Sequence, residues 1–260
     1  MATETVLATA VSNGVGKACC KSGPGYATPL AAMSGPPEKL IYVTALYSGT
    51  HFILFSSTSS FYSKFVNLLP TACIRFLHDP SKDTGYVGSA LSSNMIRFFR
   101  NSDDTWSHEV VISVEPLKVE NWILPEMPGL ITDFLISLDD RFFYFVNWLH
   151  GDIRQYNIED PKNPVLTGQI WVGGLLQKGS PVKAVREDGT TYQFDVPQIK
   201  FYPELMDKGS HIIQIDVDTE KGGLSINPDF FVDFGEEPDG PALAHEMRYP
   251  GGDCTSDIWI

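Results

Sequence analysis

The stretch from Ser137 to Ile158, SLDDRFFYFVNWLHGDIRQYNI, decides the fold of this chain. Its first five residues read as a polar turn, residues 142–148 as an aromatic strand, residues 149–152 as a tight turn and residues 153–158 as a second strand. Aromatic and β-branched residues favour strands, whereas Asp, Asn and Gly favour turns. The turn EDPKNP and the run VLTGQIWV follow, so the stretch predicts an antiparallel meander.

The same arrangement recurs on both sides of this stretch. Upstream, residues 85–91, 95–99 and 109–114 read as strands, and the segments SSN and NSDD read as the turns between them. Downstream, the runs HIIQIDVD and LSINPDFFVDFG flank the turn TEKGG. Aligning IRFF, which begins at residue 96, with IRQY, which begins at residue 153, gives an internal offset of 57 residues.

Repeated meanders of this kind are typical of β-propeller blades, although a plain β-sandwich also uses short strands with frequent turns. One blade cannot cover its two apolar faces alone, and the partial units in this chain are too few to close a ring. We therefore predict an all-β fold: an incomplete β-propeller of antiparallel four-stranded blades, preceded by an N-terminal coil. Helical periodicity is nearly absent, and the best helix candidate is residues 201–208.

Composition divides the chain into a flexible N-terminal segment, residues 1–39, and a partial propeller, residues 40–260. The first segment is small, polar and rich in Gly and Pro, whereas LIYVTALY reads as the first strand of the second. Residues 51–73 differ in texture, because Ser, Phe and Leu dominate and neither a helical nor a strand period is clear. Their longest uninterrupted apolar run is residues 52–55, far short of the ~20 residues of a membrane-spanning helix. We expect a misfitting or loosely packed segment there.

Charge and composition limit the classes of partner and the cellular compartment that we expect for this protein. The hydrophobic content is 43% and the formal net charge is −13, which indicates a globular protein and argues against nucleic acid and anionic membranes as partners. The first residues carry Glu4 and only a short apolar run, unlike an export signal. Four cysteines in 260 residues do not make a disulfide framework. We expect a cytoplasmic protein whose partners are small inorganic ligands.

Two of the four cysteines, Cys19 and Cys20, stand side by side between Lys17 and Lys21. A disulfide between neighbours closes a strained ring, so the pair is a poor structural bridge. Thiolate sulfur suits soft ions, and flanking lysines favour the thiolate. The pair therefore predicts capture of a soft metal or a selenium oxyanion, although two exposed thiols on a tail remain the alternative.

Two of the six histidines lie in turns or coil rich in polar groups. His150 lies in the turn WLHGD next to Asp152, and His245 lies in the coil LAHEMRYPGGDC, which also carries Cys254. Imidazoles on turns that face the central channel of a propeller can bind one ion, but the sequence alone favours a structural, hydrogen-bonded histidine over a metal ligand at each position. The motif HExxH, paired CxxC motifs and a phosphate-binding Gly loop are absent from the sequence.

Several stretches are long enough for comparison with known families. They are CCKSGPGYATPLAAM, IRFLHDPSKDTGYVGSALSS, WILPEMPGLITDFLISLDDRFFYFVNWLHGDIRQYNIEDPKNPVLTGQ, IQIDVDTEKGG and GPALAHEMRYPGGDCTSDIWI. Together they resemble the selenium-binding protein family, whose members include methanethiol oxidases. Within this family, the sequences of these stretches are most similar to those of plant members. In those, an N-terminal Cys-Cys pair is linked to selenite and heavy-metal binding. The resemblance implies a β-propeller in which His150 and His245 face the polar centre of the ring.

The chain also departs from this family. Members are much longer, and motifs similar to DELHH, HTSHC and DFWYQPR are absent from this sequence, as is a further strand pair expected near Lys200. The resemblance thus implies binding of selenite or a soft heavy metal at Cys19 and Cys20, with Cys254 as a secondary thiol, and no intact oxidase centre. One alternative is a methanethiol oxidase with copper at His150 and His245, which converts methanethiol, oxygen and water to formaldehyde, hydrogen peroxide and hydrogen sulfide. Another is a non-functional truncated gene product.

Overall fold

The computed structural model describes residues 29–35, 40–45, 51–56, 61–66, 71–79, 81–196 and 205–242. It describes the backbone alone in the strands before residue 75 and at residues 132, 205 and 206.

The first sheet is an antiparallel meander in which each strand pairs with the next. Its strands are β1 (Pro29–Gly35), β2 (Leu40–Ala45), β3 (His51–Ser56) and β4 (Phe61–Val66). Residues 29–35, which the sequence assigns to coil, form β1 instead. The segment 51–73, which lacks a clear period in the sequence, contains β3, β4 and the start of the following strand.

Two further four-stranded meanders follow along the chain. The second comprises β5 (Thr71–Phe76), β6 (Thr84–Ser89), β7 (Asn94–Arg100) and β8 (Trp106–Ser113), and the third comprises β11 (Ile131–Ile136), β12 (Phe142–Asn147), β13 (Asp152–Asn157) and β14 (Val165–Trp171). Ser89 pairs with Asn94 at the end of one central hairpin, and Asn147 pairs with Asp152 at the end of the other. The repeat therefore runs over 58 residues (147 minus 89), and the offset of 57 predicted from the sequence is one residue too short.

Shorter elements complete the described chain. A small sheet has the order β10-β9-β15-β16, and a two-stranded sheet pairs β17 with β18. Their bounds, with those of one helix and one 3-10 turn, are β9 (Leu117–Glu120), β10 (Glu126–Met127), β15 (Lys183–Val185), β16 (Thr191–Tyr192), α2 (Leu205–Lys208), β17 (His211–Val217), β18 (Leu224–Asp233) and η3 (Phe234–Glu236). The helix lies within residues 201–208, where the sequence places its best helix candidate. None of the helices among the described residues combines the length and the apolar character that a membrane span requires.

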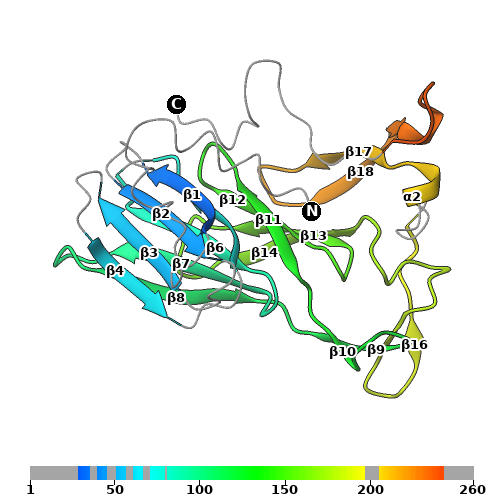
Figure 1. The fold of residues 1–260 in the computed structure, drawn as a ribbon, viewed down its shortest axis with the longest axis horizontal. Helices are drawn as coiled ribbons and strands as arrows, with labels where there is room; N and C mark the ends of the chain where they lie inside the picture. Colours follow the sequence, from blue (N-terminus) through cyan, green and yellow to red (C-terminus); the bar gives the residue numbers. More distant parts are fainter. Residues whose placement is uncertain are drawn as a thin grey trace.

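The meanders pack through their first strands (Figure 1). Strands β1 and β2 contact β5, and β11 contacts β5 and β6. First strands that lie next to one another are the arrangement of propeller blades around an axis. Aromatic side chains fill the space between the second and third meanders: Phe143 lies 4.9 Å from Phe134 and 5.3 Å from Tyr86, measured between ring centroids. The fold is thus all-β and an incomplete β-propeller, as predicted.

A buried carboxylate joins the second and third meanders. Asp140 lies in the turn between β11 and β12 and accepts hydrogen bonds from the backbone N–H groups of His78 (2.7 Å) and Asp79 (2.8 Å), both in the turn between β5 and β6. Its oxygens also lie 3.0 Å from Nδ1 of His78 and 3.6 Å from Nζ of Lys82. Burial alone would raise the pKa of Asp140, but these hydrogen bonds and the lysine hold it below its ordinary value.

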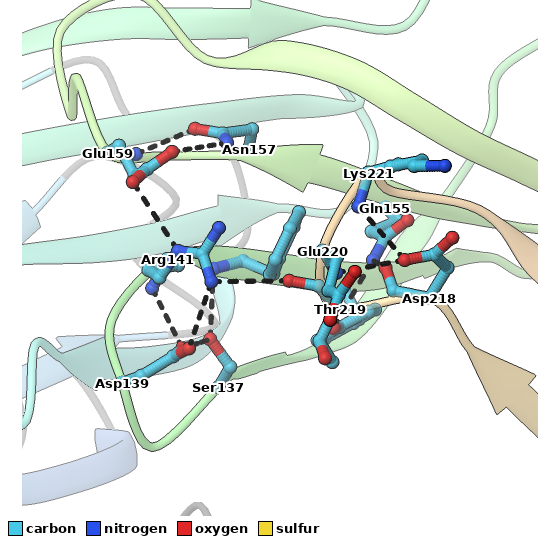
Figure 2. Close-up of polar contacts among 12 residues, drawn as sticks. Ser137, Asp139, Arg141, Gln155, Asn157, Glu159, Asp218, Thr219, Glu220 and Lys221 are labelled. Carbon is cyan, nitrogen blue, oxygen red and sulfur yellow. Dashed lines mark hydrogen bonds and ion pairs between the residues drawn. The ribbon is translucent and has the colours of Figure 1, made fainter.

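The turn between β17 and β18 is attached to the third meander by two side chains (Figure 2). The amide of the buried Gln155 accepts from the N–H of Gly223 at 2.6 Å and donates to the carbonyl of Asp218 at 3.3 Å. Nearby, Arg141 donates to the carbonyl of Thr219 at 3.2 Å and to Glu159 at 3.4 Å. Gln155 thus satisfies one donor and one acceptor of the turn, as a neighbouring strand would do.

Candidate functional site

The candidate site is built around the turn between β12 and β13, which carries His150. Gly151 adopts a φ of +79°, and a Cβ at this position would collide with the carbonyl oxygen of Gly173. The turn is held on both sides, because the N–H of Leu149 donates to the carbonyl of Gly129 (3.0 Å) and the N–H of Val172 donates to the carbonyl of Gly151 (2.8 Å). A glycine is therefore required next to the histidine, and the turn is fixed in the structure.

The imidazole of His150 is only 2% exposed. Its Nε2 lies 3.0 Å from the carbonyl oxygen of Met127, at the end of β10. A carbonyl can only accept, so Nε2 carries the proton and the lone pair of the neutral ring resides on Nδ1. Burial lowers the pKa of His150, which keeps the ring neutral near pH 7. This is the protonation state in which an imidazole binds a metal ion.

Next to it, Asp152 forms a buried polar network. One carboxylate oxygen accepts from Nδ2 of Asn147 at 3.0 Å, and the other accepts from Nε of Arg154 (2.8 Å) and Nε2 of Gln169 (2.6 Å). Burial acts to lower the pKa of Arg154, but the carboxylate of Asp152 raises it above its ordinary value. The charge of Asp152 is therefore compensated, and both of its oxygens are used.

These groups do not fit a copper centre. His150 offers one nitrogen, and the carboxylate of Asp152 is already bound to three donors. Within the part of the chain that the structure describes, three or more His, Cys, Asp or Glu side chains do not gather as metal ligands. Copper in proteins is held by several nitrogen or sulfur donors.

The other predicted site residues, Cys19, Cys20, His245 and Cys254, lie outside the described residues. Their roles stay predictions, and only His150 of the predicted set is placed. The sequence missed the partners of Asp152 on the neighbouring strands. The sequence does carry one signal for these partners, because Arg154 and Gln169 are polar residues within predicted strands. In the structure the two residues lie directly opposite each other on β13 and β14.

A second polar cluster lies at the other end of β12. A pocket of about 300 Å³ is lined by His78, Asp79, Lys82, Leu138, Asp139 and Asp140. The carboxylate of Asp140 is held there by two backbone N–H groups, an imidazole and an ammonium. These bonds connect two meanders, so we assign the cluster to stability.

The described sheets place this chain in the class of β-propeller proteins, with an incomplete ring and a neutral, buried histidine at a hairpin turn. Within that class, the chain belongs to the family described as 56kDa selenium binding protein (SBP56), whose sequence model matches residues 67–193 and 189–260. This confirms the resemblance seen in the sequence.

Individual relatives agree with this family. Selenium-binding protein 1 of Arabidopsis thaliana is 66% identical over 280 residues, which cover 91% of this chain and 57% of that protein. Methanethiol oxidase of Bos taurus is 53% identical over 220 residues, which cover 72% of this chain and 47% of that protein. A gapped alignment of 487 residues with Selenium-binding protein 2 of Arabidopsis thaliana covers 100% of both chains at 47% identity. Selenium-binding proteins 1 and 3 of Arabidopsis thaliana, at 66% and 67% identity, are thus more similar to this chain over matched residues than the methanethiol oxidase at 53%, as predicted.

The solved structure of a hypothetical selenium-binding protein from Sulfolobus tokodaii matches with a TM-score of 0.66 and 27% identity, and covers 88% of this chain and 59% of that one. The chain therefore spans about half the length of most of these relatives (47% to 59%).

Proposed function

We propose that this chain binds selenium, presented as selenite, through the adjacent thiols of Cys19 and Cys20 in the cytoplasm. The observation that carries the proposal is the 66% identity to a plant protein named for selenium binding, over 91% of this chain. The chemistry of the pair supports it, since Lys17 and Lys21 favour the thiolate and attract an oxyanion. Soft heavy metals such as cadmium would compete for the same thiolates.

The binding reaction balances without an oxidant. Each thiol of Cys19 and Cys20 forms one S–Se bond, two oxygens of selenous acid leave as water with the two thiol protons, and selenium stays in its +4 state. Both sulfurs must reach one selenium atom, so two adjacent thiols are better suited than two distant ones. Cys254 is a secondary thiol in this scheme, and a single sulfur there holds selenium less firmly.

The test compares a double variant with a matched one. Purified chain is incubated with selenite, desalted, and analysed for selenium by mass spectrometry. We expect Cys19→Ser/Cys20→Ser to lose the retained selenium and Cys254→Ser to keep most of it. Cys73→Ser is the control, because this cysteine lies in β5, far along the sequence from the pair. Equal retention by the double variant and the parent chain would contradict the proposal.

A second candidate is methanethiol oxidation, which is favoured by the 53% identity to proteins named for that activity. Metal analysis together with oxygen uptake in the presence of methanethiol tests it. Stoichiometric copper and turnover that His150→Gln abolishes would favour the oxidase. Selenium retention without copper or turnover would favour binding alone.

A further inference from the structure

The sheet formed by β17 and β18 has two strands, whereas each meander has four. Its apolar side chains are incompletely covered: Phe230, Phe231 and Val232 are each 39% exposed. An isolated two-stranded sheet is marginally stable in water, and three or more strands with a covered face are needed for stability. Among the described residues, the sheet has no further strand to pair with.

The hydrogen bonds at both ends of the hairpin show which backbone groups face outward. The N–H of Phe234 donates to the carbonyl of Ser210, and the N–H of Asp218 donates to the carbonyl of Gly223. Backbone groups alternate in direction along a strand, and these bonds place the even-numbered residues of β17 toward β18 on both sides of the irregularity in register between Ile213 and Ile215. The backbone N–H and C=O groups of Ile213 and Ile215 consequently face the edge of β17 that is away from β18. The described residues provide no further strand at that edge.

Among the described elements, that edge lies on the side of the hairpin away from the third meander. Strand β18 contacts β14 of the third meander, and β17 lies beyond β18 in the same view (Figure 1). Such an edge is a template for a strand of another chain. The residue types also favour pairing, because Ile213 and Ile215 are β-branched and half-buried.

We propose that β17 pairs antiparallel with β17 of a second copy of this chain, about a two-fold axis at Gln214, and that the two hairpins form one four-stranded sheet. In this register Ile213 lies opposite Ile215 of the second copy, and both present their backbone groups to the interface. The pairing is self-complementary, as a two-fold interface requires. It also gives the strand number found in each meander.

The charges of β17 permit this register. Asp216 lies opposite Ile212 of the second copy, and the two Asp216 carboxylates are separated by about 13 Å along the strands. This separation exceeds the ~8 Å over which charges interact at physiological salt. Each copy carries a net charge of −13, so long-range repulsion opposes association. We expect the dimer to tighten as the salt concentration rises.

Disulfide cross-linking tests the register directly. In the proposed dimer, Gln214 lies opposite Gln214 of the second copy at a non-hydrogen-bonded position. Cα atoms at such a position are about 4.5 Å apart, so a disulfide can form between cysteines placed there. Under mild oxidation, Gln214→Cys is expected to give a covalent dimer, whereas Asp216→Cys, which is distant from its copy, is expected to stay at the level of the parent chain. Equal cross-linking by the two variants would overturn the proposal.

A charge exchange tests the same interface without oxidation. Ile213→Lys/Ile215→Lys places lysines opposite each other and is expected to give a monomer by light scattering, whereas Ile213→Lys/Ile215→Glu pairs opposite charges and is expected to restore the dimer. Val110→Lys, on the edge strand β8 and 54% exposed, is the control and should leave the mass unchanged. Circular dichroism checks that each variant is folded. A parent chain that is monomeric at every concentration and salt level would also overturn the proposal.

Discussion

His150 and Asp140 lie in turns at opposite ends of β12, and their different surroundings give them different roles. Asp140 accepts from two backbone N–H groups of the preceding meander, which makes it a structural residue. The Nε2–H group of His150 donates a hydrogen bond to the carbonyl of Met127, and Nδ1 keeps a lone pair, which makes His150 the better candidate of the two for binding a ligand.

Replacing Asp140 should weaken the contact between the meanders. Asp140→Ala leaves two backbone donors and a lysine without their acceptor, and we expect the free energy of unfolding to fall by about 3 kcal/mol. Asp139→Ala removes a more exposed carboxylate with local partners and should cost much less. Urea denaturation of both variants measures the difference. Equal losses would show that Asp140 has no special role.

The buried imidazole of His150 should make stability depend on pH. Its pKa is lowered in the folded chain, so the unfolded chain binds the proton first as the pH falls. The stabilisation is therefore present above the ordinary pKa of 6.5 and is lost as the pH falls through the lower folded value. We expect the parent chain to lose more stability than His150→Gln between pH 7 and pH 5.5 in urea denaturation. A pH-independent difference would contradict this.

At the residue scale, the sequence identifies His150 but not its environment. The turn WLHGD is recognisable from its residue types, and the tight turn at Gly151 is confirmed by a positive φ. Met127 could not be predicted as its partner, because it comes from β10 in a different sheet. Contacts of this kind depend on how sheets pack, which local patterns do not contain.

At the element scale, Gln155 and Arg141 attach the β17–β18 hairpin to the third meander. Gln155→Leu removes an acceptor and a donor used by the hairpin turn. We expect the amides of β17 and β18 to exchange with solvent roughly tenfold faster, while those of β12 change little. Lys221→Gln is the control, because only its backbone N–H takes part in the turn's hydrogen bonds. Hydrogen-exchange mass spectrometry distinguishes the two, and equal exchange in both variants would contradict this assignment.

The longer strands were predictable, because aromatic and β-branched runs between Asp- and Gly-rich turns identify β6, β7, β12, β13 and β14. The short strands β10 and β16, of two residues each, were not predictable, since so few residues carry no period. The sequence predicts coil where β1 forms, because Gly and Pro surround this strand.

At the scale of the whole molecule, the aromatic layer between the second and third meanders is the main described core. Phe143→Ala removes a fully buried ring, and we expect a loss of about 3–5 kcal/mol in the free energy of unfolding. Phe230→Ala deletes the same side chain from an exposed position and should cost roughly 1 kcal/mol. Calorimetry would show a large fall in melting temperature for the first variant only. Similar melting temperatures would contradict this view of the core.

The contact made by Asp140 has an evolutionary consequence. Its carboxylate recognises main-chain amides of the neighbouring repeat, and every amino acid except proline offers such an amide. A gene rearrangement that removes whole repeats would keep the two backbone hydrogen bonds wherever the new neighbour presents its amides in a similar turn. The contacts with the side chains of His78 and Lys82 would depend on the sequence of that neighbour.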